Sequence, residues 1–237
     1  MLGESINNSF QRKSTELDLG ENQDTEFCRV ATIDIGTNST HLLIAKVEPK
    51  LNTFSIELAE KSTTRLGERD PDTGELTSIA MNRAFSTLQR FKDLSESYKV
   101  ESLIIAATSA VREAVNGGIF ISEIKKKIGL DVELISGAEE ARLIYLGVLS
   151  GMQFGNKPHL VLDIGGGSTE LILADSSEAR ALTSTKIGAV RLQREFIKKD
   201  PISPQNELFL RSFIRGSMES AIDKVSKRIE VGEEPVL

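Results

Sequence analysis

The hydrophobic positions near the start of the chain follow the pattern of consecutive strands. Residues 30–35 form a short apolar run rich in β-branched side chains, which is typical of a buried strand. Residues 40–47 form a second such run, and residues 53–61 alternate apolar and polar side chains. After Thr77, a candidate N-cap, the spacing becomes that of a helix, because one apolar face recurs at intervals of four and three: Ala80, Ala84, Leu88 and Phe91.

The next stretch alternates between strands and helices. Its pattern predicts a buried strand at 102–108, a short helix at 109–115 ended by Gly117-Gly118, a helix at 118–128 ended by Gly129, a strand at 131–136 and a helix at 137–152.

The pattern of the first segment then returns. Strands are predicted at 159–164, 169–175 and 181–188, followed by a helix at 189–200 and a long helix from the Ser203 cap and Pro204 to about Ile229. The order strand, turn, strand, strand, helix therefore occurs twice, which indicates an α/β chain built as two related halves. We predict a disordered polar tail at 1–27, a first domain at 28–140 and a second at 141–237.

Composition narrows the classes of function. The chain has 237 residues, is 39% hydrophobic and carries a formal charge of −6, which argues against non-specific DNA binding. It contains no apolar run near the roughly 18 residues that a membrane span needs, and its polar start does not resemble a secretory signal. The lone thiol, Cys28, indicates a reducing compartment and is interpreted as a packed strand residue. We therefore expect a cytoplasmic protein without a membrane partner.

The two halves share a motif at the first turn of each. Residues 34–39 read DIGTNS and residues 163–168 read DIGGGS, each between two predicted strands. A glycine-rich turn aims several backbone N–H groups at one point, which attracts phosphate, and nearby hydroxyl and amide groups add donors. The candidate phosphate-binding residues are Gly36, Thr37, Asn38, Ser39, Gly165, Gly166, Gly167, Ser168 and Thr169.

Acidic residues flank both turns. Asp34 and Asp163 end the strands that precede them, and Glu170 follows the second. Carboxylates beside phosphate are repulsive unless a cation lies between them, and Mg²⁺ takes oxygen ligands from carboxylates and phosphate. These three residues are therefore candidate Mg²⁺ ligands.

Neither turn matches a common nucleotide-binding motif. The chain has no G-x-x-x-x-G-K-[ST] motif, and no G-x-G-x-x-G that opens a helix, so two common nucleotide-binding motifs are excluded. Each turn alone could be an ordinary hairpin turn. The shared Asp-Ile-Gly start and hydroxyl-rich tips favour phosphate binding for the pair.

Four segments together resemble one known family. TIDIGTNSTHLLIA, ATSAVREAVNG, LISGAEEARLIYLGV and LVLDIGGGSTELIL are similar in order and spacing to the exopolyphosphatase/guanosine pentaphosphate phosphatase (Ppx/GppA) family, from about Arg29 to about Ile229. The resemblance implies two ribonuclease-H-like domains, of the actin/sugar-kinase/Hsp70 superfamily, with mixed sheets and a cleft between them. It implies Mg²⁺-dependent hydrolysis of the terminal phosphoanhydride of inorganic polyphosphate, or of the 5′-terminal phosphate of pppGpp. It also implies a possible homodimer.

The resemblance assigns roles to particular residues. It places the catalytic base at Glu140, the second glutamate of the EEARL segment, and it places phosphate-binding arginines at Arg65 and Arg112. Without the family, Glu140 would be taken as a first-turn glutamate that stabilises the helix dipole, and either arginine as part of a surface ion pair. Glu113 is the competing base. Glu139 points about 100° away from Glu140 on a helix, so the two cannot share one water.

The family pattern continues past the long helix with a strand and a Gly-Gly-Thr loop, which the segment ending IEVGEEPVL does not reach. We therefore expect an incomplete second domain and a chain whose activity is uncertain. Three classes of function are compatible with the motifs. The first is a Mg²⁺-dependent phosphatase that cleaves phosphoanhydrides, with polyphosphate preferred to pppGpp. The second is a kinase of the same superfamily, and the third is a non-catalytic phosphate or nucleotide sensor.

Overall fold

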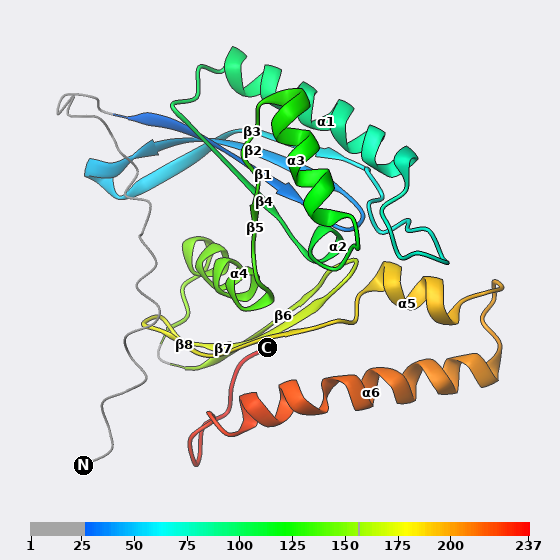
Figure 1. Ribbon diagram of the computed structural model, residues 1–237. Helices are drawn as coiled ribbons and strands as arrows, with labels where there is room; N and C mark the ends of the chain where they lie inside the picture. The colour runs from blue at the N-terminus through cyan, green and yellow to red at the C-terminus, as the bar shows by residue number, and fades with distance from the viewer. Residues whose placement is uncertain (1–26, 156) are drawn as a thin grey trace, which may run out of the picture.

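The computed structural model describes residues 27–155 and 157–237, arranged as two sheets with helices packed on them (Figure 1). The predicted tail at 1–27 lies outside the described residues except for Phe27. No helix in the described ranges is both long enough and apolar enough to cross a membrane.

The first sheet has five strands. They are β1 (Cys28–Ile35), β2 (Thr40–Glu48), β3 (Thr53–Ser62), β4 (Ser102–Ala107) and β5 (Glu133–Leu134), in the order β3-β2-β1-β4-β5. The strands β1 to β3 pair antiparallel, whereas β4 runs parallel to β1 and β5 runs parallel to β4. The sheet is therefore mixed, as predicted, and the strand expected at 131–136 is limited to two residues.

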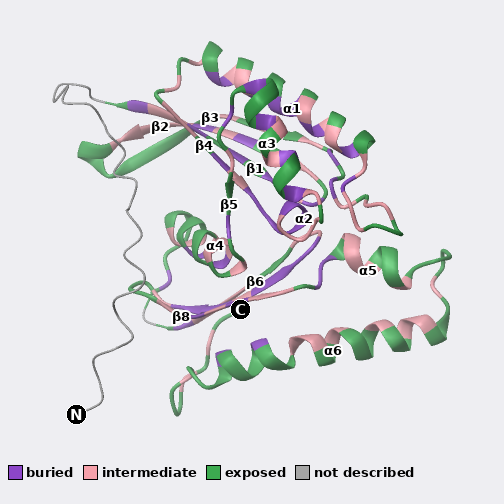
Figure 2. Ribbon diagram, viewed as in Figure 1, coloured by how far each residue is buried: buried purple, intermediate pink, exposed green. Residues whose placement is uncertain are grey.

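Two helices, α1 (Ser78–Ser97) and α3 (Gly117–Ile128), cover one face of this sheet (Figure 1). The four residues of the predicted apolar face of α1 are all completely buried. Figure 2 shows buried segments recurring along this helix. The Thr77 hydroxyl accepts a hydrogen bond from the Ala80 N–H, so the predicted cap is confirmed. Gly129 ends α3 with φ of 79°, as predicted from its freedom to adopt the left-handed region.

The prediction for Gly117-Gly118 is wrong. The short helix α2 (Ser109–Arg112) ends before these glycines, and Gly117 instead begins α3. Its glycine identity has a steric reason, because a Cβ at this position would lie 2.1 Å from the carbonyl oxygen of Val111. The glycine therefore permits close backbone packing between two helices and does not terminate one.

The second half repeats the hairpin of the first. Its sheet contains β6 (His159–Ile164), β7 (Thr169–Ala174) and β8 (Ala179–Thr185), in the order β6-β7-β8. Asp34 pairs with His41 across the first hairpin, and Asp163 pairs with Glu170 at the equivalent place in the second. Val236 forms a parallel bridge with His159. In the first sheet, Ser102 of β4 likewise pairs in parallel with Val30 of β1.

Helices lie on both faces of the second sheet. They are α4 (Gly137–Gly151) and α6 (Pro204–Ser226), with α5 (Ala189–Phe196) between β8 and α6 in sequence. Ile172 packs with Tyr145 of α4, whereas the next residue, Leu173, packs with Val225 of α6. Alternation along β7 therefore buries both faces, and the Ser203 cap and Pro204 start of α6 are confirmed. The predicted domain boundary at residue 140 falls inside α4.

Candidate functional site

The two glycine-containing loops meet at the junction of the halves. Each is closed by the same backbone hydrogen bond, from Gly36 N–H to Ser39 O at 3.1 Å and from Gly165 N–H to Ser168 O at 3.0 Å. A Cβ on Gly166 would lie 3.0 Å from Cβ of Thr37, so the loop tips are in direct contact. The first and second hairpins therefore place their candidate phosphate-binding residues side by side.

Several hydroxyls of the loops are engaged by the protein itself. The hydroxyl oxygens of Thr37 and Ser109 are 3.0 Å apart, and the buried Thr169 hydroxyl donates to the carbonyl oxygen of Ile187. Ser39 Oγ lies 2.9 Å from His41 Nε2. Asn38 is exposed at the tip of the first loop. Thr37 and Thr169 therefore shape the loops, and Asn38 is the loop side chain most accessible to a ligand.

Four carboxylates gather beside the loops. Asp34 and Asp163 are the next-to-last residues of β1 and β6, Glu170 is the second residue of β7, and Glu140 lies in the first turn of α4. The charges of neighbouring carboxylates contribute to raising the pKa of Asp34, Glu140 and Glu170. Asp34 is accessible to solvent, yet the surrounding protein, together with Asp163, raises its pKa to about 6. Burial raises the pKa of Glu170 to about 7, opposed by a 2.7 Å hydrogen bond from the Ser184 hydroxyl. A cation between these groups would relieve their repulsion.

The donor set fits Mg²⁺ by its chemistry. Among the described residues, no three His, Cys, Asp or Glu side chains are already arranged to hold a metal ion. Mg²⁺ commonly binds through only one or two carboxylates and completes its shell with waters and substrate phosphate. Asp34, Asp163 and Glu170 are therefore suitable oxygen ligands for a metal that arrives with a phosphate.

Glu140 is held by an arginine of the other half. The Nη1 group of Arg112 donates to the carbonyl oxygen of Ile135 at 2.7 Å, and both Nη groups lie 3.3 Å from Glu140 Oε2. Burial raises the pKa of Glu140, Arg112 lowers it, and Asp34 and Asp163 raise it further; the net direction is upward. A glutamate with a raised pKa near a developing negative charge is suited to accept a proton.

The neighbouring glutamate lies on a different face of the helix. Glu139 pairs with Arg142 at 2.8 Å on the surface. The Ser136 hydroxyl accepts from the Glu139 N–H and so caps α4, which sets where the first turn places Glu140. The prediction that the two glutamates face different surroundings is confirmed.

Arg65 lies beside the first loop in a left-handed conformation, with φ of 51°. Its N–H donates to the carbonyl oxygen of Asn38 at 2.9 Å. Its guanidinium is exposed and lies 3.6 Å from Glu68, a surface pair of small energetic value. The residue therefore supports the loop through its backbone, and its side chain stays accessible.

Sequence reasoning missed other parts of the junction. Ser184 on β8 orients Glu170, and Ser109 at the start of α2 contacts Thr37. Glu113, the competing base, forms an ion pair with Arg191 of α5 and belongs to a separate cluster with Arg69. The contacts of these residues could not be read from local motifs, because they depend on how the two halves meet.

Replacing Glu170 by Gln should stabilise the metal-free protein at pH 8 and not at pH 5. The folded pKa of about 7 exceeds the ordinary value of 4.5, so the folded state loses stability as pH rises through this window. Removing the charge should raise the free energy of unfolding by about 1–3 kcal/mol at pH 8. Urea titrations at both pH values, with a chelator present, measure this difference. Glu219→Gln on exposed α6 is the control, and an equal effect of Glu170→Gln at both pH values would contradict the expectation.

Comparison with known proteins gives a consistent result. Residues 43–234 match the Ppx/GppA phosphatase family. The chain is 35% identical over 201 residues to guanosine-5′-triphosphate,3′-diphosphate pyrophosphatase of Photobacterium profundum, covering 84% of this chain and 37% of that protein. It is 34% identical over 204 residues to exopolyphosphatase 2 of Mycobacterium tuberculosis (strain H37Rv), covering 83% and 64%.

A solved structure agrees with the fold. The crystal structure of an exopolyphosphatase from Cytophaga hutchinsonii superposes with a TM-score of 0.79 at 33% identity, over 84% of this chain and 63% of that one. The predicted α/β fold class of the Ppx/GppA proteins is confirmed, with a mixed first sheet. The strands β6, β7 and β8 of the second sheet pair antiparallel. The chain spans between about a third and two thirds of the length of these relatives.

Proposed function

Because the chain belongs to the Ppx/GppA phosphatase family, we propose that it takes part in Mg²⁺-dependent hydrolysis of the terminal phosphoanhydride of inorganic polyphosphate. The observation that supports this proposal is the position of Glu140. Its carboxylate is paired with Arg112 and lies among other carboxylates, beside the two glycine-containing loops, whose tips are in contact. An exopolyphosphatase needs this combination of an oriented base and anion-binding backbone.

In this proposal Glu140 acts as the general base. A water molecule attacks the terminal phosphorus atom, its proton passes to a carboxylate oxygen of Glu140, and the bridging P–O bond breaks. The products are orthophosphate and a chain shortened by one phosphate. Arg112 fixes the Glu140 carboxylate through Oε2, and its donors also suit a phosphate oxygen.

In the proposal the loops bind phosphate and the acidic residues bind the metal. The Gly36–Ser39 and Gly165–Thr169 turns would hold phosphate oxygens through backbone N–H groups, with Asn38 and Arg65 at the accessible edge. Asp34, Asp163 and Glu170 would hold Mg²⁺. When bound, the ion supplies neutralisation of the charge that develops on the phosphates.

Hydrolysis of the 5′-terminal phosphate of pppGpp is the second candidate. It is favoured by the likeness to the pyrophosphatase of Photobacterium profundum, whose name includes a guanosine polyphosphate. A non-catalytic phosphate sensor is the third, and the raised pKa of Glu140 argues for chemistry instead.

Phosphate release tests these alternatives. The chain should release orthophosphate from long linear polyphosphate with Mg²⁺, and lose at least 90% of that rate when a chelator removes the metal. Parallel assays with pppGpp compare the two substrates by kcat/KM. Binding of either substrate without release of phosphate would overturn the proposed hydrolysis by this chain and favour the sensor.

A further inference from the structure

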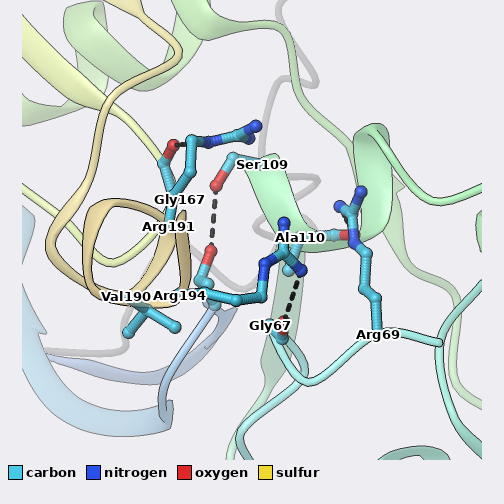
Figure 3. A pocket seen from close by; sticks show the side chains of 9 residues that line it. Gly67, Arg69, Ser109, Ala110, Gly167, Val190, Arg191 and Arg194 are labelled. Atoms are coloured by element: carbon cyan, nitrogen blue, oxygen red, sulfur yellow. Dashed lines mark hydrogen bonds between the residues drawn. The ribbon is translucent and has the colours of Figure 1, made fainter. Parts of the chain in front are cut away.

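Three arginine side chains gather at a second place on the junction. Arg69 comes from the loop after β3, and Arg191 and Arg194 come from α5 in the other half (Figure 3). Arg69 interacts electrostatically with Arg191, Arg194 and Glu113, and Arg191 forms an ion pair with Glu113. Three positive charges and one negative charge leave this group with a net charge of +2.

The internal hydrogen bonds do not use all the donors of these arginines. Arg69 donates to the carbonyl oxygens of Ala110 at 2.8 Å and Glu113 at 3.1 Å. Arg191 donates through Nε to Gly167 O at 3.1 Å and through Nη2 to Glu113 Oε2. Since each guanidinium has five N–H donors, several remain for a ligand.

The positive charges of this group are only partly compensated. Burial lowers the pKa of Arg69, Glu113 raises it, and Arg191 and Arg194 lower it further. Glu113 Oε1 is buried and accepts no hydrogen bond from any described residue. A bound anion would compensate the excess positive charge, which Glu113 compensates only in part.

The arginines line a pocket beside both loops. Gly167 of the second loop and Gly67 also line it (Figure 3). Thr37 of the first loop belongs to the same lining. None of the four carboxylates at Glu140 lines this pocket. The pocket therefore shares the loops with the proposed cleavage site and has its own charged groups.

We propose that this arginine pocket is a second phosphate-binding site, separate from the site at Glu140. Its ligand is a phosphate group, carried either by free orthophosphate or by a linear polyphosphate chain. Binding there requires no hydrolysis, so the site can be tested whether or not the chain is active.

The pocket must open slightly to admit this ligand. The space enclosed by its side chains is about 20 Å³, which is about the room for one water molecule. Arg194 is exposed and is held there by a 3.4 Å contact to Gly67 O. It can therefore turn outward and close over a phosphate, while Arg69 and Arg191 stay in place.

The binding experiment uses backbone amide NMR on the whole chain without metal, so that turnover is suppressed. Adding orthophosphate or a linear polyphosphate should shift the Gly67 signal in a saturable way, because Gly67 lines this pocket and does not belong to the loops proposed to hold the substrate at Glu140. Arg194→Gln should weaken the affinity about tenfold, because it removes a charged donor from the phosphate. Arg215→Gln, the same change on an exposed part of α6, is the matched control and should leave the affinity unchanged.

The ligands distinguish the two sources of phosphate. If the site takes free phosphate, orthophosphate binds and Arg194→Gln weakens that binding. If the site takes part of a chain, only linear polyphosphate binds in a way that Arg194→Gln weakens. Equal weakening by Arg194→Gln and Arg215→Gln would overturn the proposal, since only general charge would then matter. So would the lack of an Arg194-dependent response to either ligand.

Discussion

Replacing Glu140 by Gln should lower kcat for polyphosphate hydrolysis by about 10²–10⁴-fold while leaving substrate affinity largely intact. The amide cannot accept the proton of the attacking water, although it has nearly the same shape. It can still accept a hydrogen bond from Arg112, so the local structure should persist. Steady-state kinetics with saturating Mg²⁺ measure the effect, and circular dichroism verifies that the variant is folded.

Glu139→Gln is a close control for this variant. It makes the same chemical change one residue away on the same helix, where the side chain pairs with Arg142 on the surface. Its kcat should stay within about twofold of the parent, because surface pairs contribute little. If both variants kept the parent's kcat, Glu140 would not be the base.

The pH dependence of kcat/KM separates a catalytic role of Glu140 from a purely structural one, because a structural role would not shift its acid limb. Since burial raises the pKa of Glu140, the acid limb of kcat/KM should lie above the range of an ordinary glutamate. The activity left in Glu140→Gln should lack this limb. The same limb in the variant would assign it to another group.

Replacing Gly188 by Ala should lower the free energy of unfolding by about 3 kcal/mol and weaken phosphate binding. Gly188 caps α5, and a Cβ there would lie 2.5 Å from the carbonyl carbon of Gly166 and from the nitrogen of Gly167. Both atoms belong to backbone, which cannot rotate away as a side chain can. Chemical unfolding and binding of a non-hydrolysed phosphate ligand measure the two effects.

The second loop depends on this contact. The Ala189 N–H donates to Gly165 O, and the Val190 and Arg191 N–H groups donate to Gly166 O, so the first turn of α5 holds the loop. Gly216→Ala on exposed α6 is the control, because a Cβ there meets no atom within 4 Å. This substitution should raise the free energy of unfolding by as much as about 1 kcal/mol. A stable Gly188→Ala variant with normal binding would show that the loop tolerates a shift of α5.

Local sequence patterns predicted most of the fold. The apolar face of α1, its Thr77 cap and the repeated hairpins were predictable, because side-chain period and capping act over a few residues. Gly117 shows the limit of such reasoning. A glycine near a helix end can terminate the helix or can permit close backbone packing. Only the position of the Val111 carbonyl oxygen in the folded structure shows that packing is the reason here.

The sequence by itself determined the duplicated α/β pattern, the two Asp-Ile-Gly loops and, through resemblance, the family and the residues Glu140 and Arg112. Only the tertiary structure decided how these parts meet: Arg112 against Glu140, Ser184 against Glu170, and Arg69 with Arg191 and Arg194. The physical reason is range. Periodicity, capping and turn chemistry involve neighbours in the chain, whereas charge pairing and pKa shifts depend on groups that folding brings together from distant segments.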